Sequence, residues 1–119
     1  MLQVSAPFHC ALMKPAEERL SVDLDQLEFR DLKVPLVTNV DAAPITKGSD
    51  ARNALKRQVS NPVRWQESVQ RLIAEGASKF VEVGPGKVLI GLIRSIDKSA
   101  TMLNADDEKS LENVFSGLL

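Results

Sequence analysis

Apolar residues recur at three- and four-residue steps near the start of the chain, which is the spacing of one helical face. The stripe consists of Met13, Ala16, Leu20, Leu24 and Leu27. Pro15 fits such a helix only in its first turn, because its missing N–H has no partner to lose there. The pattern therefore predicts a helix that begins just after His9 and ends near Leu27.

Short apolar runs between the helical patterns predict strands. They are residues 33–40 (KVPLVTNV), 79–83 (KFVEV) and 100–104 (ATMLN), and residues 2–5 predict the end of a further strand. Strands that alternate with amphipathic helices favour βα units and a mostly parallel sheet with helices on both faces. We therefore expect an α/β fold in three layers, cut from a larger domain, with some apolar surface and sheet edge left uncovered.

Capping residues predict where the other helices begin and end. Ser49 is the expected N-cap of the second helix, and Asn61 followed by Pro62 begins the third. Gly76 supplies a left-handed stop, and Asp106 caps the last helix. The fourth helix carries its apolar stripe at Val88, Leu89, Leu92, Ile93 and Ile96.

Composition narrows the class of protein. The chain has 119 residues, 44% of them apolar and 26% charged, which is typical of one globular domain. A net charge of −1 argues against nucleic acid as a partner, and the apolar runs are too short for a membrane span. No secretory signal is visible, and a single cysteine, Cys10, excludes an internal disulfide. These features favour the cytoplasm or an organelle matrix.

His9 is the one histidine and the first candidate for chemistry. It lies between a predicted strand end and a helix start, where ligands gather in open α/β sheets. Imidazole suits proton transfer near neutral pH, but a general base needs a nucleophile. Adjacent side chains diverge in both strands and helices, so we do not expect Cys10 to pair with His9. No G-x-S-x-G elbow occurs in the sequence. One histidine and one cysteine also leave no ligand set for a metal, and we expect no cofactor.

Two further features of the sequence each allow two interpretations. Residues 81–89 (VEVGPGKVL) fail the Walker and dinucleotide patterns, so this strand–turn–helix either faces an anion with its free N–H groups or simply reverses the chain. Chain reversal is the favoured interpretation. Arg52, Lys56 and Arg57 share a helical face that is either solvated or docks an acidic partner.

Three segments carry a family resemblance. Residues 4–16 (VSAPFHCALMKPA), 57–65 (RQVSNPVRW) and 81–92 (VEVGPGKVLIGL), in this order and spacing, resemble malonyl-CoA:acyl-carrier-protein transacylase of fatty-acid synthesis. The resemblance covers essentially the whole chain and corresponds to the final two-fifths of the family enzyme. It implies an α/β-hydrolase-like acyltransferase fold. Residues 1–119 would be the C-terminal portion of the large domain, with residues 1–5 ending a small ferredoxin-like insertion.

The resemblance also implies roles. His9 matches the catalytic histidine that takes a proton from a serine, and the Gln58 main-chain carbonyl matches the acceptor of its other ring N–H. Phe8 matches the bulky residue that favours malonyl over methylmalonyl groups. The implied partners are malonyl-CoA, acyl carrier protein and the N-terminal part of the same enzyme. That part holds the family's serine, its carboxylate-binding arginine and its oxyanion loop, so we expect the isolated chain to be inactive.

Two alternatives remain at this point. One is a non-catalytic module that binds acyl carrier protein, or a partner acyltransferase chain, through the basic face. The other is an unrelated hydrolase with a cryptic serine nucleophile.

Overall fold

A computed structural model of the chain describes residues 7–118. The chain forms two compact units, Met1–Ser68 and Val69–Leu119, and the boundary falls within helix α3. The predicted strand end at residues 2–5, and the assignment of residues 1–5 to an insertion, lie outside the described residues. Among residues 7–118, no helix has the length and apolar character that crossing a membrane requires.

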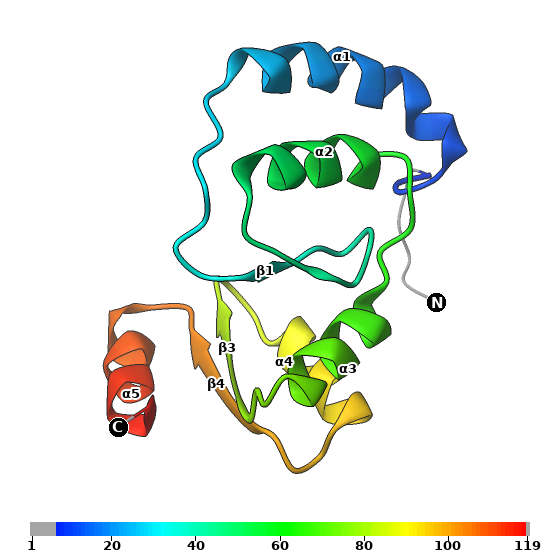
Figure 1. The fold of residues 1–119 in the computed structure, drawn as a ribbon. Coiled ribbons are helices and arrows are strands. Elements are labelled where there is room, and N and C mark those ends of the chain that lie inside the picture. The colour runs from blue at the N-terminus through cyan, green and yellow to red at the C-terminus, as the bar shows by residue number, and fades with distance from the viewer. Residues whose placement is uncertain (1–6, 119) are drawn as a thin grey trace. The chain divides into compact units, whose positions relative to one another are not determined.

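The first unit pairs two helices with a small hairpin. Its elements are the 3-10 turn η1 (Ala11–Met13), α1 (Lys14–Gln26), β1 (Leu36–Val37), β2 (Pro44–Ile45), α2 (Gly48–Gln58) and the start of α3 (Trp65–Ala74). Helices α1 and α2 run side by side, and the hairpin follows from the long connection after α1 (Figure 1). Strands β1 and β2 are antiparallel, with Leu36 opposite Ile45.

Helix α1 confirms the predicted element, because it begins at Lys14 with Pro15 in its first turn and ends at Gln26. Leu24 is buried, whereas Leu20 and Leu27 stay exposed. Two polar links join the end of α1 to α2. The ammonium of Lys56 donates to Asp25 at 2.5 Å, and the guanidinium of Arg52 donates to the Leu27 carbonyl at 3.0 Å.

The predicted strand over residues 33–40 is much shorter in the structure. Only Leu36–Val37 is extended and paired, its partner is the antiparallel β2, and Leu36 is exposed. The reason is local: a turn closed by the Ala42 N–H and the Thr38 carbonyl (2.8 Å) returns the chain at once to its own strand. A nearby antiparallel partner needs only this short turn, whereas a parallel partner needs a long crossover.

Three predicted helix starts are shifted. Helix α2 begins at Gly48 with Lys47 as N-cap, not Ser49, and the distant Asp31 carboxylate accepts the Gly48 N–H at 3.1 Å. Helix α3 begins at Trp65 rather than Pro62. In the last helix Asp107, not Asp106, provides the cap, because its carboxylate accepts the Ser110 N–H at 2.7 Å. Local composition marked each boundary region, but the residue that caps depends on backbone geometry.

The second unit is a βαβ arrangement followed by one more helix. Strands β3 (Lys79–Val83) and β4 (Thr101–Ala105) pair in parallel, with Lys79 opposite Thr101 and Val83 opposite Ala105. Helix α4 (Val88–Ile96) connects them, and α5 (Glu108–Leu118) follows β4. Gly76, at φ +97°, ends α3 in the left-handed region as predicted. This parallel pair with its connecting helix confirms the α/β fold class.

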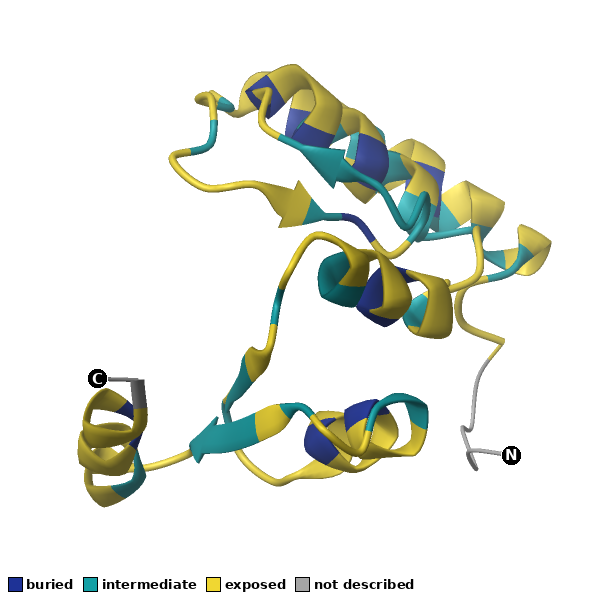
Figure 2. Cartoon of the chain, turned by 60° about the horizontal axis from the view of Figure 1, so that its bottom comes forward, coloured by how far each residue is buried: buried dark blue, intermediate teal, exposed yellow. Residues whose placement is uncertain are grey.

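The apolar cores of both units are small. Leu24, Ala51 and Ala54 are buried in the first unit, and Val69, Ile90, Ile93 and Val114 in the second. Exposed positions cover most of the ribbon (Figure 2). Large apolar side chains stay uncovered, for example Leu12 at 74% and Val83 at 82% exposure. Uncovered apolar surface of this kind agrees with the expectation of a piece cut from a larger domain.

Candidate active site

His9 lies in the turn that leads into η1 and α1, and its side chain is exposed. Its Nδ1 atom is 2.8 Å from the main-chain oxygen of Gln58, the last residue of α2. A carbonyl oxygen only accepts, so Nδ1 carries the proton, and in the neutral ring Nε2 keeps a free lone pair. That tautomer is the one a general base needs when it takes a proton through Nε2.

The backbone of His9 is itself unusual, with φ at +55° in the left-handed region. Non-glycine residues adopt this region rarely, and such conformations persist where surrounding structure holds them, often at functional sites. The conformation and the Gln58 contact together fix where the imidazole stands.

Helix geometry explains why the Gln58 carbonyl is available. The last four carbonyls of a helix have no partner within the helix, and Gln58 ends α2. The Gln58 side chain serves a second purpose, because its Nε2 donates to the Asn61 carbonyl at 3.0 Å. The main chain of this residue therefore faces His9 while its side chain holds the following loop.

The neighbours of His9 point elsewhere. Phe8 is 56% exposed, so its ring is available to a bound group. The Cys10 thiol donates to the Pro7 carbonyl at 3.0 Å, which directs it to the backbone. This contact agrees with the prediction that Cys10 and His9 do not form a catalytic pair.

Glu17 is a residue that the sequence interpretation missed. It is buried on α1 and accepts hydrogen bonds from the Lys14 ammonium, at 2.5 Å, and from the Ser60 hydroxyl. The Lys14 hydrogen bond, and then that of Ser60, holds the pKa of Glu17 below its ordinary value. The sequence contained a sign of this burial. Position 17 lies on the same helical face as Met13 and Leu20, so a carboxylate falls within the apolar stripe of this helix.

The basic face of α2 is tied into the first unit. The Arg57 guanidinium donates to both oxygens of Asp41, at 2.7 and 2.6 Å, and Arg52 lies over the Phe29 ring at 5.2 Å from its centre. The bond to Arg57 lowers the pKa of Asp41 and raises that of Arg57. Lys56, as described above, binds Asp25. Each of these cations therefore has an intramolecular partner, which weakens the case for a free docking face.

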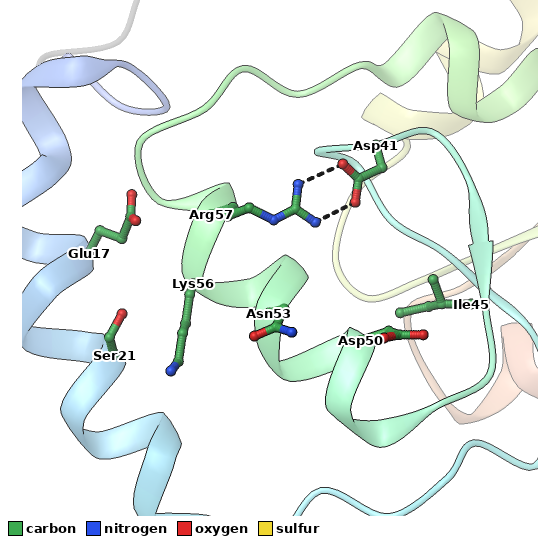
Figure 3. A pocket seen from close by; sticks show the side chains of 8 residues that line it. All are labelled: Glu17, Ser21, Asp41, Ile45, Asp50, Asn53, Lys56 and Arg57. Atoms are coloured by element: carbon green, nitrogen blue, oxygen red, sulfur yellow. Dashed lines mark hydrogen bonds and ion pairs between the residues drawn. The ribbon is translucent and has the colours of Figure 1, made fainter.

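A polar hollow of about 580 Å³ lies between α1 and α2. Figure 3 shows Glu17 and Ser21 reaching toward it from α1, and the fork of Arg57 closed on Asp41 at its other side. Charges of both signs line this hollow, so it carries no single charge preference for a ligand.

The turn after β3 reverses the chain, as favoured from the sequence. The Glu82 carboxylate accepts the N–H groups of Leu89, at 3.1 Å, and Ile90, at 2.9 Å. An acidic side chain of the protein thus occupies the first turn of α4, where a bound anion would otherwise lie. Nor do residues 7–118 contain a cluster of three His, Cys, Asp or Glu side chains placed to hold a metal ion.

Comparison with known proteins identifies the relatives of this chain. No family model matches. A relative from Escherichia coli K12 is 49% identical over 84% of the chain, and one from Bacillus subtilis strain 168 is 42% identical over 93%. Both are named malonyl CoA-acyl carrier protein transacylase. The curated homologues of this chain are malonyl CoA-acyl carrier protein transacylases. The chain spans 32% and 35% of these two proteins, consistent with a C-terminal fragment.

Solved structures give the same result. An acyl carrier protein S-malonyltransferase from Vibrio cholerae superposes with a TM-score of 0.88 at 44% identity, covering 95% of this chain and 37% of that one. The Bartonella henselae S-malonyltransferase has a TM-score of 0.92 at 36% identity, covering 98% and 37%. A third match, with a TM-score of 0.90 at 40% identity, is a malonyl-transacylase in complex with its type II polyketide acyl-carrier protein, covering 98% and 38%. The transacylase fold thus contains a region with the architecture of this chain.

Proposed function

We propose that this chain is the C-terminal part of a malonyl-CoA:acyl carrier protein S-malonyltransferase and supplies the histidine side of its Ser–His site. The contact between His9 Nδ1 and the Gln58 main-chain oxygen, at 2.8 Å, carries the proposal. It orients the ring as the acid of a Ser–His–Asp triad does, but with a neutral acceptor. The relatives' names supply the reaction and its substrates.

His9 Nε2 acts as the base in the first half-reaction. A serine hydroxyl from the N-terminal part of the enzyme passes its proton to Nε2 as its oxygen attacks the thioester carbon of malonyl-CoA. When the tetrahedral intermediate collapses, the C–S bond breaks and His9 returns the proton to the departing CoA thiolate. The product of this half is a malonyl ester of the serine.

The second half-reaction runs the same steps in reverse order. The phosphopantetheine thiol of acyl carrier protein gives its proton to His9 Nε2 and attacks the ester carbon. The serine oxygen then leaves and takes the proton back from His9. Throughout, the Gln58 carbonyl keeps Nδ1 protonated, so Nε2 remains the atom that accepts and returns the proton.

We assign Phe8 to the acyl pocket. The ring precedes His9 directly and is exposed, so in the complete site it would occupy the space that an α-methyl branch on the acyl group needs. Apolar packing against one methyl group is worth about 1–3 kcal/mol, so this selectivity is partial.

Dependence on a second polypeptide segment is part of the proposal. The sequence contains no G-x-S-x-G elbow, and the chain spans about a third of its relatives. These two observations support our placing the serine in the N-terminal part of the enzyme. Fatty-acid synthesis by such an enzyme belongs in the cytoplasm or an organelle matrix.

A chimera tests this function. The matching segment of the Escherichia coli relative is replaced by this chain, and malonyl transfer from malonyl-CoA to acyl carrier protein is measured. His9→Ala should lower the rate by about 10²–10⁴-fold, the usual contribution of a general base. Cys10→Ala is the matched control, because its thiol faces the Pro7 carbonyl and should leave the rate unchanged.

Two results would contradict the proposal. Equal rates for His9→Ala and the unmodified chimera would remove His9 from the mechanism. Rapid malonyl transfer by the isolated 119-residue chain would show that no second segment is needed.

A further inference from the structure

We propose that Glu17 and Ser60 are positioning residues, whose mutual hydrogen bond holds the Gln58 carbonyl against the imidazole of His9. The inference rests on the proposed function in taking His9 as the proton-transfer group. It concerns a pair that the relatives' names and the mechanism above leave unassigned.

Two hydrogen bonds join the same two segments of the chain. His9 and Glu17 belong to the turn-and-helix segment that begins the described structure, and Gln58 and Ser60 belong to the end of α2 and the loop after it. One link joins His9 to the Gln58 oxygen, and the other joins Glu17 to the Ser60 hydroxyl, across separations of 49 and 43 residues. Two links fix a relative orientation that one alone leaves free to rotate.

Burial makes the second link strong. The Glu17 side chain is only 11% exposed, whereas that of its ion-pair partner Lys14 is 57% exposed. A buried carboxylate must keep its hydrogen bonds, and bonds to an ionised acceptor are about twice as strong as neutral ones. Lys14 balances the charge from within the same helix, so Ser60 is the donor that reaches across from the other segment.

Among the described residues, the other polar links from α2 reach the end of α1 opposite to His9. Lys56 binds Asp25 in the last turn of α1, and Arg52 binds the Leu27 carbonyl just beyond it. On α1 both links lie at the end opposite to His9, whereas Lys56 itself belongs to the last turn of α2, as Gln58 does. At the start of α1, the Glu17–Ser60 bond is the polar link that joins this helix to the loop after α2.

The Glu17–Ser60 bond therefore stabilises the Nδ1–H tautomer of His9, and neither residue contacts the substrate. The His9 ring is exposed, so few packing contacts restrain it. If the Gln58 oxygen drifts, Nδ1 loses its acceptor and the neutral ring relaxes toward the Nε2–H form that free histidine favours. That form has no lone pair at Nε2 to receive a proton.

Nuclear magnetic resonance on the intact chain tests this directly. His9 is the one histidine, so the ¹⁵N shifts of its two ring nitrogens, recorded where the ring is neutral, report the tautomer without assignment ambiguity. We expect the native chain to be mainly Nδ1–H. Ser60→Ala should lower the ratio of Nδ1–H to Nε2–H about tenfold, which corresponds to about 1.4 kcal/mol. Ser60→Thr keeps a hydroxyl and should restore the native ratio.

A second substitution guards against a simple folding defect. Glu17→Gln keeps the shape and an acceptor oxygen but loses the charge, and should give a ratio between those of the native chain and Ser60→Ala. Ser21→Ala is the matched control. It removes a hydroxyl from the same helix and the same hollow, and among the described residues that hydroxyl makes no hydrogen bond.

Each outcome decides one question. A native ratio in both Ser60→Ala and Glu17→Gln would overturn the positioning role, whatever their stability. A ratio that falls equally in Ser21→Ala would also overturn it, because the effect would then be general to the helix. A native chain that is already Nε2–H would instead contradict the His9–Gln58 contact, and with it the proposed function.

Discussion

The Nδ1 atom of His9 lies 2.8 Å from the main-chain oxygen of Gln58, although 49 residues separate them. The contact exists because α2 ends at Gln58 and leaves its carbonyl without a helical partner. A histidine oriented by a main-chain oxygen does not depend on a particular side chain at the acceptor position. It depends on where the helix ends and on what holds that end in place.

Removing the Gln58 side chain separates these two factors. Gln58→Ala should keep the contact with His9, because the acceptor is in the main chain. It should lower the free energy of unfolding by about 0.5–1.5 kcal/mol, since the bond from Nε2 to the Asn61 carbonyl is lost. Urea unfolding measures the loss, and the His9 ring ¹⁵N shifts should stay native. A changed tautomer in a stable variant would show that the side chain orients the ring as well.

Phe8 should control which acyl group is accepted. In the chimera, Phe8→Ala opens space beside the acyl group and should raise the kcat/KM for methylmalonyl-CoA relative to malonyl-CoA by about 10- to 200-fold. Both constants are measured with the same carrier protein. An exposed apolar residue on the same segment, Leu12, provides the control, and Leu12→Ala should leave the ratio unchanged. An unaltered ratio in Phe8→Ala would place this ring outside the acyl pocket.

Gly48 is a site where no side chain fits. A Cβ atom there would lie 2.6 Å from the Arg30 carbonyl oxygen and still closer to that of Phe29, and neither is a flexible group. Gly48→Ala should therefore lower the free energy of unfolding by about 1–3 kcal/mol, as overpacking does. Thermal unfolding measures the change. Gly91→Ala is the matched control within a helix, where nothing stands within 4 Å, and it should be neutral or stabilising.

Glu82 should act as a helix cap. Glu82→Ala leaves the N–H groups of Leu89 and Ile90 without their acceptor and should cost about 0.5–2 kcal/mol. Glu82→Gln keeps one acceptor oxygen and should recover part of the loss. If inorganic phosphate raises the free energy of unfolding of the native chain as much as that of Glu82→Ala, residues 81–89 would bind an anion in spite of Glu82.

Stability should fall in acid. The hydrogen bond from Arg57 lowers the pKa of Asp41 from the ordinary 3.8, and that from Lys14 lowers the pKa of Glu17 from 4.5. Folding therefore favours the ionised forms. Their contribution is complete above the unfolded-state pKa values and is lost as pH falls through the lower folded-state values. Urea unfolding between pH 7 and pH 3 should show a plateau and then a decline below about pH 4.5.

The Asp41–Arg57 pair provides the check on this assignment. Asp41→Asn and Arg57→Gln each break the same ion pair by removing one of its charges, so both should make the acid decline shallower. A free energy of unfolding that rises toward pH 3 would have the wrong sign for lowered carboxyl pKa values.

Much of the α/β character could be predicted from local pattern. The apolar periods of α1 and α4 and the apolar runs of β3 and β4 are short-range signals, and each element lies where its pattern indicates. The buried face of α4 differs from the predicted stripe, because Ile90 and Ile93 are buried whereas Val88, Leu89 and Leu92 are exposed. The 33–40 run shows the limit of this approach. Apolar β-branched residues favour an extended chain, but the choice of β2 as an antiparallel partner followed from the turn at Thr38–Ala42.

The candidate site divides in the same way. The sequence by itself indicated the candidate groups, because a histidine, a glutamine and a bulky ring occur in segments that resemble a known family. Only the tertiary structure decided how they are held. It brought the Gln58 oxygen within hydrogen-bond distance of His9 Nδ1 and placed the Ser60 hydroxyl against the buried Glu17 carboxylate. It also paired Arg57 with Asp41 and let Glu82 cap the N-terminus of α4. The physical reason is that hydrogen-bond partners far apart in the chain are chosen by packing, which no local period encodes.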